Sequence, residues 1–176
     1  KAGPGKKVAI LGLGGLGHMG VKYAKAMGAE VTVFSHSPEK RDDALSMGAT
    51  HFVAKAGPED FKKLAKTFDL ILNTVSVDLN LEDYLGMLKL DGTLVLIGLP
   101  GAPYSVPAGV LLGQRRRLAG SMIGGVRELQ EMLNFSGEHN ITSDVEVIDP
   151  SYINTAWDRT VKSDVKYRFV IDVSKI

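Results

Sequence analysis

Residues 10–20 read ILGLGGLGHMG, and this glycine-rich stretch decides the fold of the chain. Gly12, Gly14 and Gly17 form the pattern G-x-G-x-x-G, with Gly15 as an additional glycine. An apolar run typical of a buried strand precedes the pattern, and a helical pattern follows it. A turn between such elements presents the free N–H groups of the helix N-terminus to a phosphate. The stretch predicts a dinucleotide cradle; the alternative is a glycine turn without a ligand.

Each glycine of the pattern has a physical task in such a turn. The first allows the tight turn, the second lets the backbone approach a pyrophosphate, and the third lets the helix pack closely on the strand. A P-loop is excluded, because no Gly-Lys-Ser or Gly-Lys-Thr sequence follows. The glycine loop of protein kinases fits poorly, because a helix of this kind does not follow it.

Strand-length apolar runs alternate with helix-length amphipathic runs along the first 125 residues. Most of the apolar runs are continuous, as expected for strands that are buried on both faces of a parallel sheet. The repeated β–α–β units predict a doubly wound α/β fold with right-handed crossovers. The expected strands are 7–13, 30–35, 51–54, 70–75, 93–99 and 117–123, and the expected helices are 15–27, 37–48, 58–66 and 80–89.

The regular alternation of strand-length and helix-length runs ends after Gly125. A helix is expected over 126–139, a short strand over 144–148, a helix over 150–162 and a last strand over 167–173. These elements do not extend the alternation. We therefore expect two parts, a dinucleotide-binding domain at 1–125 and a C-terminal segment at 126–176 that belongs partly to another domain.

The end of the second expected strand indicates which dinucleotide binds. NAD-binding sites carry an acidic residue there, which holds the ribose hydroxyls. This strand ends at Ser35, and no Asp or Glu occurs before Glu39. A carboxylate would repel the 2′-phosphate of NADP, whereas a serine is small and donates a hydrogen bond. The sequence favours NADP over NAD.

Lys40 supports this preference. It lies in the first turn of an expected helix that has Ser37 as N-cap, where a cation opposes the helix macrodipole. A phosphate bridging Ser35, Lys40 and His36 would reverse the sign of that interaction. The alternative is a solvated face on which Asp42 and Asp43 neutralise Lys40 and Arg41.

Composition limits the remaining possibilities. The 176 residues fit one domain, or one domain and a fragment of another, and the formal net charge is +1. We expect neither nucleic-acid binding nor membrane insertion, because the charge is small and the apolar runs are far shorter than roughly 20 residues. The sequence lacks cysteine and an N-terminal methionine. We expect a cytoplasmic protein without disulfides or thiolate metal sites, present here as a segment.

Several polar residues have simpler interpretations than function. The four histidines lack the spacing of metal ligands, and His18 is expected to start a helix and face the domain cleft. The basic run Arg115–Arg117 is expected to be a solvated edge rather than a nucleic-acid contact.

Longer stretches resemble a known family. KAGPGKKVAILGLGGLGHMGVKYAKAMGAEVTVFS, GTLVLIGLP, GSMIGG and DVKYRFVID together resemble the nucleotide-binding half of zinc-dependent alcohol dehydrogenases, in the medium-chain dehydrogenase/reductase superfamily. The nearest branch is that of cinnamyl-alcohol-dehydrogenase-like, NADP-dependent aldehyde reductases. The resemblance implies a Rossmann-type six-stranded parallel sheet in the order 3-2-1-4-5-6.

The resemblance also implies roles for individual residues around NADP(H). The pyrophosphate would be held by Arg168 and by the loop residues Gly12, Gly14, Gly15, Leu16 and Gly17. The 2′-phosphate would be surrounded by Ser35, His36, Ser37 and Lys40. The adenosine side would be flanked by Thr74 and Val75, and the nicotinamide would be lined by Gly98, Leu99, Ser121 and Ile123.

The zinc of such enzymes polarises an alcohol or aldehyde, and its ligands lie in a GroES-like domain that would precede this chain. The resemblance thus implies a chain that binds cofactor, binds no metal, contains no catalytic residue and does not turn over substrate alone. It also implies a homodimer through the edge strand near Arg115–Arg117. Two alternatives stay open, a zinc-free quinone or enoyl reductase and a non-catalytic nucleotide-binding module. A short-chain dehydrogenase is disfavoured, because no Tyr-x-x-x-Lys occurs.

Overall fold

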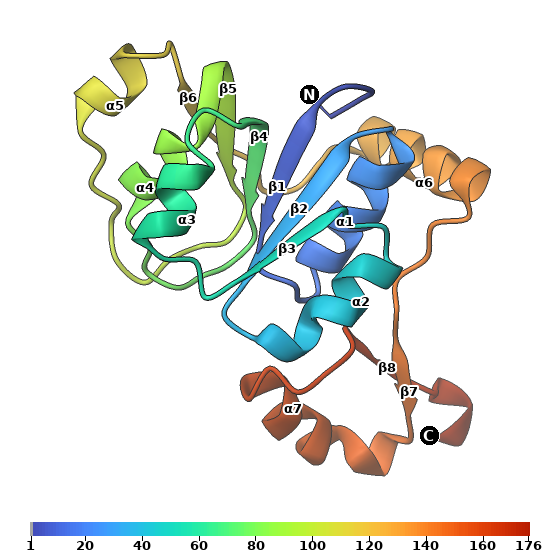
Figure 1. Cartoon of the computed structure of the whole chain (residues 1–176). Coiled ribbons are helices and arrows are strands. Elements are labelled where there is room, and N and C mark those ends of the chain that lie inside the picture. The colour runs from blue at the N-terminus through green and yellow to red at the C-terminus, as the bar shows by residue number, and fades with distance from the viewer. Residues whose placement is uncertain (1) are drawn as a thin grey trace.

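The computed structural model describes residues 2–176, and its centre is a six-stranded parallel sheet (Figure 1). The strand order is β3-β2-β1-β4-β5-β6, which confirms the order expected from the sequence. The strands are β1 (Lys7–Leu11), β2 (Glu30–Ser35), β3 (His51–Ala54), β4 (Phe68–Asn73), β5 (Leu88–Leu96) and β6 (Arg117–Gly120). The last of these ends three residues earlier than expected.

Helices cover both faces of the sheet (Figure 1). They are α1 (Gly17–Ala26) and α2 (Arg41–Ser46) on one face, and α3 (Pro58–Lys63), α4 (Leu81–Gly86) and α5 (Ala108–Leu112) on the other. Strand β1 shows why the apolar runs are continuous. Val8 and Ile10 pack in the core under α1, whereas Ala9 and Leu11 pack in the core under α4, and all four are at most 2% exposed.

The second expected helix has a different start. Pro38–Lys40 form a separate 3-10 turn, and α2 begins at Arg41. Ser37 precedes this turn, but its side chain makes no capping hydrogen bond. Lys40 therefore lies before the α-helix and not in its first turn. The unfavourable interaction with the helix macrodipole, which the sequence predicted for a lysine in the first turn, does not arise there.

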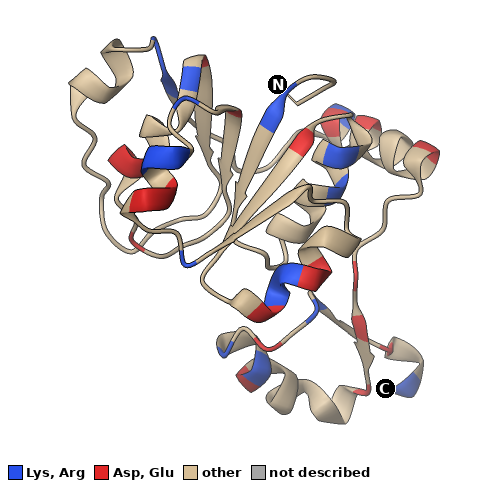
Figure 2. Cartoon of the chain, viewed as in Figure 1, with Lys and Arg blue, Asp and Glu red and all other residues tan. Residues whose placement is uncertain are grey.

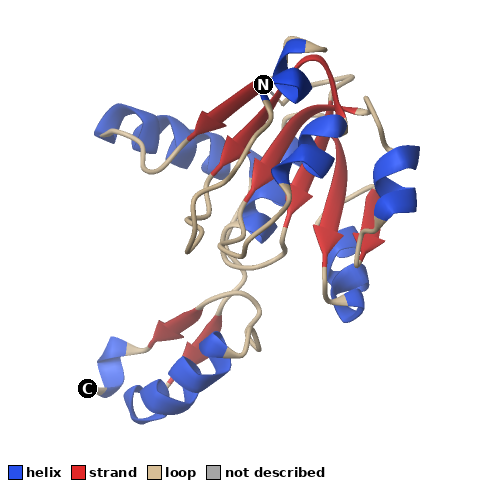
Figure 3. Cartoon of the chain, turned by 90° about the vertical axis from the view of Figure 1, so that its left-hand side faces the viewer, coloured by secondary structure: helices blue, strands red, loops and turns tan. Residues whose placement is uncertain are grey.

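The C-terminal residues form a long helix and a small separate unit. Helix α6 (Val126–His139) packs on α1, where the Tyr23 hydroxyl lies 2.6 Å from Ser136 Oγ. Strands β7 (Glu146–Ile148) and β8 (Phe169–Ile171) pair in parallel, with α7 (Ile153–Val161) between them in the sequence. Figure 3 shows this unit beyond one end of the large sheet.

The basic run has two kinds of arginine. Arg115 and Arg117 are exposed and both pair with Asp91. Arg116 is half-buried, and its guanidinium donates to the carbonyls of Gly86, Leu88 and Val110 at 2.9–3.1 Å. The expected solvated edge is therefore wrong for Arg116, which joins α4, β5 and α5.

Charges elsewhere are mixed. Figure 2 shows acidic and basic residues interspersed along the helices. Within residues 2–176 no helix is both long and apolar enough to cross a membrane.

Candidate functional site

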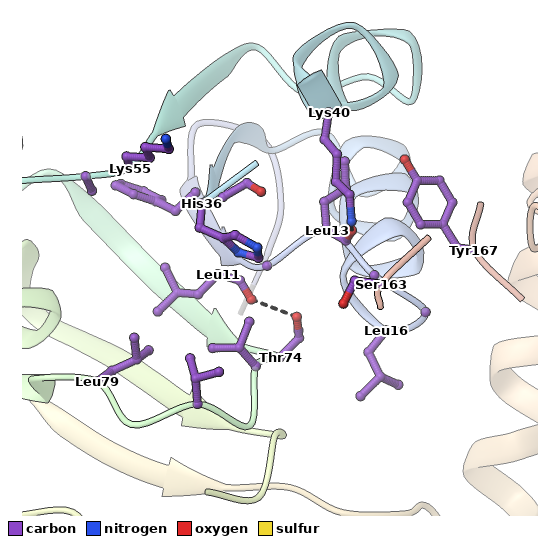
Figure 4. A pocket seen from close by; sticks show the side chains of 18 of the residues that line it. Leu11, Leu13, Leu16, His36, Lys40, Lys55, Thr74, Leu79, Ser163 and Tyr167 are labelled. Carbon is purple, nitrogen blue, oxygen red and sulfur yellow. Dashed lines mark hydrogen bonds between the residues drawn. The ribbon is translucent and has the colours of Figure 1, made fainter. Parts of the chain in front are cut away.

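A cavity of about 550 Å³ lies at the carboxyl ends of β1, β2 and β4 (Figure 4). The strand order reverses between β1 and β4, and open parallel sheets bind ligands at such a switch point. Nine of the residues expected at a cofactor site line it. They are Gly12, Gly14, Gly15, Leu16, Ser35, His36, Lys40, Thr74 and Val75.

Two glycines of the loop are required by packing. Gly12 has a φ of +91°, and a Cβ there would collide with the Val75 side chain. A Cβ on Gly17 would collide with the Gly12 carbonyl oxygen. Gly14 differs, because a Cβ there would meet nothing within 4 Å. The first and third glycines thus let the loop close on the helix, and the second leaves the cavity open.

The loop also presents donors to the cavity. Helix α1 begins at Gly17 with Leu16 as a cap residue that makes no side-chain capping bond. Within the described chain, the backbone N–H groups of Gly14, Gly15 and Leu16 donate to no protein acceptor. The first turn of α1 contains no acidic residue. The positive end of the helix dipole and these N–H groups therefore favour an anion here.

Ser35 is the last residue of β2, and Lys40 ends the 3-10 turn that follows it. The Ser35 hydroxyl oxygen accepts a hydrogen bond from the Ser37 N–H at 3.1 Å. The Lys40 ammonium donates to the Leu13 carbonyl at 3.2 Å, so it lies over the glycine loop (Figure 4). Ser37 is only 9% exposed and does not line the cavity. A cation and a hydroxyl thus both line the cavity beside the loop.

Residues that follow β4 form the opposite wall. The Thr74 hydroxyl donates to the Leu11 carbonyl at 2.7 Å, which ties β4 to β1 (Figure 4). Gly98 lies after the end of β5 and does not itself line the cavity. A Cβ on Gly98 would collide with the Val75 carbonyl, so the chain approaches Val75 this closely only with glycine there.

Three expected nicotinamide residues lie elsewhere. Leu99 and Ile123 are 78% and 89% exposed, and Ser121 is exposed too. All three follow the carboxyl ends of β5 and β6 without lining the cavity. Their role at the nicotinamide stays a prediction.

The C-terminal segment supplies part of the site that the sequence did not indicate. Its residues Thr160, Ser163, Val165 and Tyr167 line the cavity. The Arg168 guanidinium donates to the Gly15 carbonyl at 2.9 Å, which places this arginine against the loop. Lys55, directly after β3, also lines the cavity. Its position was predictable, since β3 is parallel to β2 and ends at the same edge of the sheet.

His18 does not face the cleft, contrary to the expectation. The residue is 0% exposed, and its ring stacks on Tyr167 with 4.9 Å between centroids. Its nitrogens lie 3.0 Å from the Gly14 carbonyl oxygen and 3.2 Å from Ser143 Oγ. The helical periodicity could not show this burial, because the residues that cover His18 are more than 120 positions later.

Known proteins resemble this chain in sequence and in fold. A family model described as zinc-binding dehydrogenase matches residues 15–138. The chain belongs to this family. NADP-dependent alcohol dehydrogenase C 1 of Mycolicibacterium smegmatis is 60% identical over 99% of the chain and 50% of its own length. The chain thus spans about half the length of the curated relatives it matches.

Solved dehydrogenase structures share the fold. A cinnamyl alcohol dehydrogenase of Sorghum bicolor superposes with a TM-score of 0.93 at 46% identity, covering 98% of this chain and 49% of the other. A cinnamyl alcohol dehydrogenase of Helicobacter pylori, described as a complex with NADP(H), gives 0.87 at 40% identity, covering 99% and 50%.

The family name raises the question of whether residues of this chain could bind a metal. Over residues 2–176, no group of three His, Cys, Asp or Glu side chains is arranged to hold a metal ion. The side chains of these described residues thus do not fit a zinc site.

An ion pair attaches the C-terminal segment of the chain to α2. The Lys166 ammonium lies 2.8 Å from Asp43 Oδ2, and the Tyr167 hydroxyl donates to the same oxygen at 3.1 Å. The hydrogen bond from Lys166, followed by smaller contributions that include the one from Tyr167, lowers the pKa of Asp43.

Replacing Asp43 by asparagine is expected to destabilise the chain at neutral pH and not in acid. Because the folded pKa is depressed, the stabilisation is present above the unfolded pKa of about 3.9 and is lost as the pH falls through the folded value. Urea unfolding at pH 7 should show a loss on the order of 1 kcal/mol, since Lys166 is exposed. The loss should shrink below about pH 4. Asp42→Asn, an exposed neighbour in α2, is the control. A pH-independent difference would contradict the ion-pair interpretation.

Proposed function

We propose that this chain binds NADP(H) for a zinc-dependent alcohol dehydrogenase or aldehyde reductase. One observation carries the proposal. Among the described residues, a cavity at the sheet's switch point combines loop N–H groups that have no protein acceptor with Lys40 and Lys55, and no Asp or Glu lines it. NADP carries a 2′-phosphate of about −1.5 to −2 charge in addition to its pyrophosphate. The names of the relatives, NADP-dependent alcohol dehydrogenase and aldehyde reductase, support the same ligand and reaction class.

The residues divide by the part of the cofactor that each would hold. The loop Gly12–Gly17 would receive the pyrophosphate, since its residues 12–16 line the cavity, and Arg168 lies against the same loop. Ser35, His36 and Lys40, which line the cavity, would hold the 2′-phosphate. Ser37 does not line the cavity, and its N–H, which donates to the Ser35 hydroxyl, would position that hydroxyl. Thr74 and Val75 would flank the adenosine side, and Gly98, Leu99, Ser121 and Ile123 the nicotinamide. When bound, the nicotinamide supplies or accepts a hydride at its C4 atom.

The rest of the enzyme is proposed from the family. The alcohol or aldehyde and the zinc would be held by a domain outside this chain, so the chain alone would bind cofactor without turnover. The division at residue 125 stays a prediction, as do the homodimer through β6 and the cytoplasmic location. The attachment of residues 126–176 to α1 and α2 makes the C-terminal segment part of the proposed cofactor site as well.

A binding titration tests the cofactor. We expect the chain to bind NADPH at least tenfold more tightly than NADH, measured by the change in nicotinamide fluorescence at low ionic strength. Because the difference comes from charge on the 2′-phosphate, it should narrow as salt is added. Equal affinities at low salt, or tighter binding of NADH, would contradict the assignment.

A further inference from the structure

We propose that His18 is a positioning residue of the glycine loop: its ring fixes the Gly14 carbonyl and so aims the Gly15 N–H at the cofactor pyrophosphate. The proposal rests on the proposed function above.

The surroundings of the ring determine where its proton lies. The Asp144 backbone N–H lies 3.3 Å from His18 Nε2 and can only donate. Nε2 is therefore an acceptor, and the proton of the neutral ring is on Nδ1, from which it donates to the Gly14 carbonyl at 3.0 Å. Burial lowers the pKa of His18, which favours the same neutral form.

The Gly14 carbonyl is then held by two donors. One is the His18 backbone N–H at 3.0 Å, and the other is the imidazole Nδ1–H. In a planar trans peptide the N–H points away from the carbonyl, so fixing this oxygen turns the Gly15 N–H to the opposite side, that of the cavity. Gly14 has no side chain to restrain it, and an added Cβ would meet nothing within 4 Å. Because glycine is conformationally permissive, this carbonyl contact replaces the missing steric restraint.

The next carbonyl is held in a similar way. Arg168 donates to the Gly15 carbonyl, and the preceding residue, Tyr167, stacks on His18. His18 thus has two sides with distinct tasks. Nδ1 contacts the loop, whereas Nε2 contacts Ser143 and Asp144 of the C-terminal segment. If His18 had a purely structural role, that role would depend on the Nε2 contacts with Ser143 and Asp144 alone.

Two substitutions distinguish the Nδ1 contact with the loop from the Nε2 contacts with the C-terminal segment. His18→Asn keeps an amide nitrogen near the place of Nδ1, so it retains the loop contact. His18→Gln reaches the place of Nε2, so it retains only the contact with the C-terminal segment. We expect His18→Asn to bind NADP⁺ within about threefold of the unmodified chain, and His18→Gln to bind about tenfold more weakly, the worth of one buried hydrogen bond.

The second ligand is 2′-AMP, which carries the adenosine 2′-phosphate and no pyrophosphate. Its affinity should stay unchanged in both variants. Equal losses for 2′-AMP and NADP⁺, or the reverse order of the two variants, would overturn the proposal. If the unmodified chain binds neither ligand, the proposed function fails instead.

A measurement on the unmodified chain keeps the test independent of how the variants fold. Nitrogen-15 NMR of the His18 ring at pH 7 should show a proton on Nδ1 and none on Nε2. A proton on Nε2 would overturn the proposal, because the ring could not then donate to Gly14.

Discussion

Replacing Gly17 by alanine is expected to weaken NADP⁺ binding at least 100-fold and to lower the melting temperature. The added Cβ would collide with the carbonyl oxygen of Gly12, which is backbone and cannot move aside as a flexible side chain would. The loop and α1 would have to separate, and the N–H groups of Gly15 and Leu16 would leave their positions at the cavity. Fluorescence titration and a circular dichroism melt measure the two effects.

Two other glycines provide matched controls. Gly137 lies inside α6 with nothing within 4 Å of an added Cβ, so Gly137→Ala should leave cofactor affinity unchanged. A Cβ on Gly14 also meets nothing within 4 Å, so Gly14→Ala should leave the melting temperature unchanged. It should nevertheless weaken NADP⁺ binding, because the added methyl group enters the space assigned to the pyrophosphate. Wild-type affinity in the Gly17 variant would contradict the cradle.

Local patterns were sufficient to predict the sheet and the glycine loop. Continuous apolar runs recur at β–α–β spacing, and the loop's glycines are adjacent in the sequence, so both are visible without long-range information. The strand order came from the family resemblance. Strand ends were less certain: β6 stops at Gly120, because pairing with β5 ends at Leu96, and Ser121 follows as exposed chain.

Long-range contacts explain what the sequence did not indicate. His18 is buried by Tyr167 and by the chain at Ser143, and Arg116 is bonded to carbonyls of three separate segments. Nothing in the residues around each histidine or arginine distinguishes such a position from a solvent-exposed one. Ser163 lines the cavity for the same reason, from a segment assigned to another domain.

Replacing Ser35 by aspartate is expected to weaken NADP⁺ binding about 100-fold while NAD⁺ binding stays unchanged or tightens. Ser35 lines the cavity at the end of β2, where the 2′-phosphate is assigned. Two unit charges about 5 Å apart repel by roughly 3 kcal/mol at an effective dielectric constant of about 20, which corresponds to a factor above 100. An aspartate can also accept hydrogen bonds from ribose hydroxyls, which only NAD⁺ presents in pairs there.

Ser35→Ala is the control for the Ser35→Asp prediction, because it removes the hydroxyl without adding charge. Its NADP⁺ affinity should fall by about tenfold at most, the worth of one hydrogen bond. The loss in the aspartate variant should shrink with added salt, since exposed charges are screened, whereas a loss caused by misfolding would not. Equal losses for NADP⁺ and NAD⁺ in the aspartate variant would show that Ser35 does not adjoin the 2′-phosphate. A selective loss that salt relieves would instead assign cofactor choice to the charge at the end of β2.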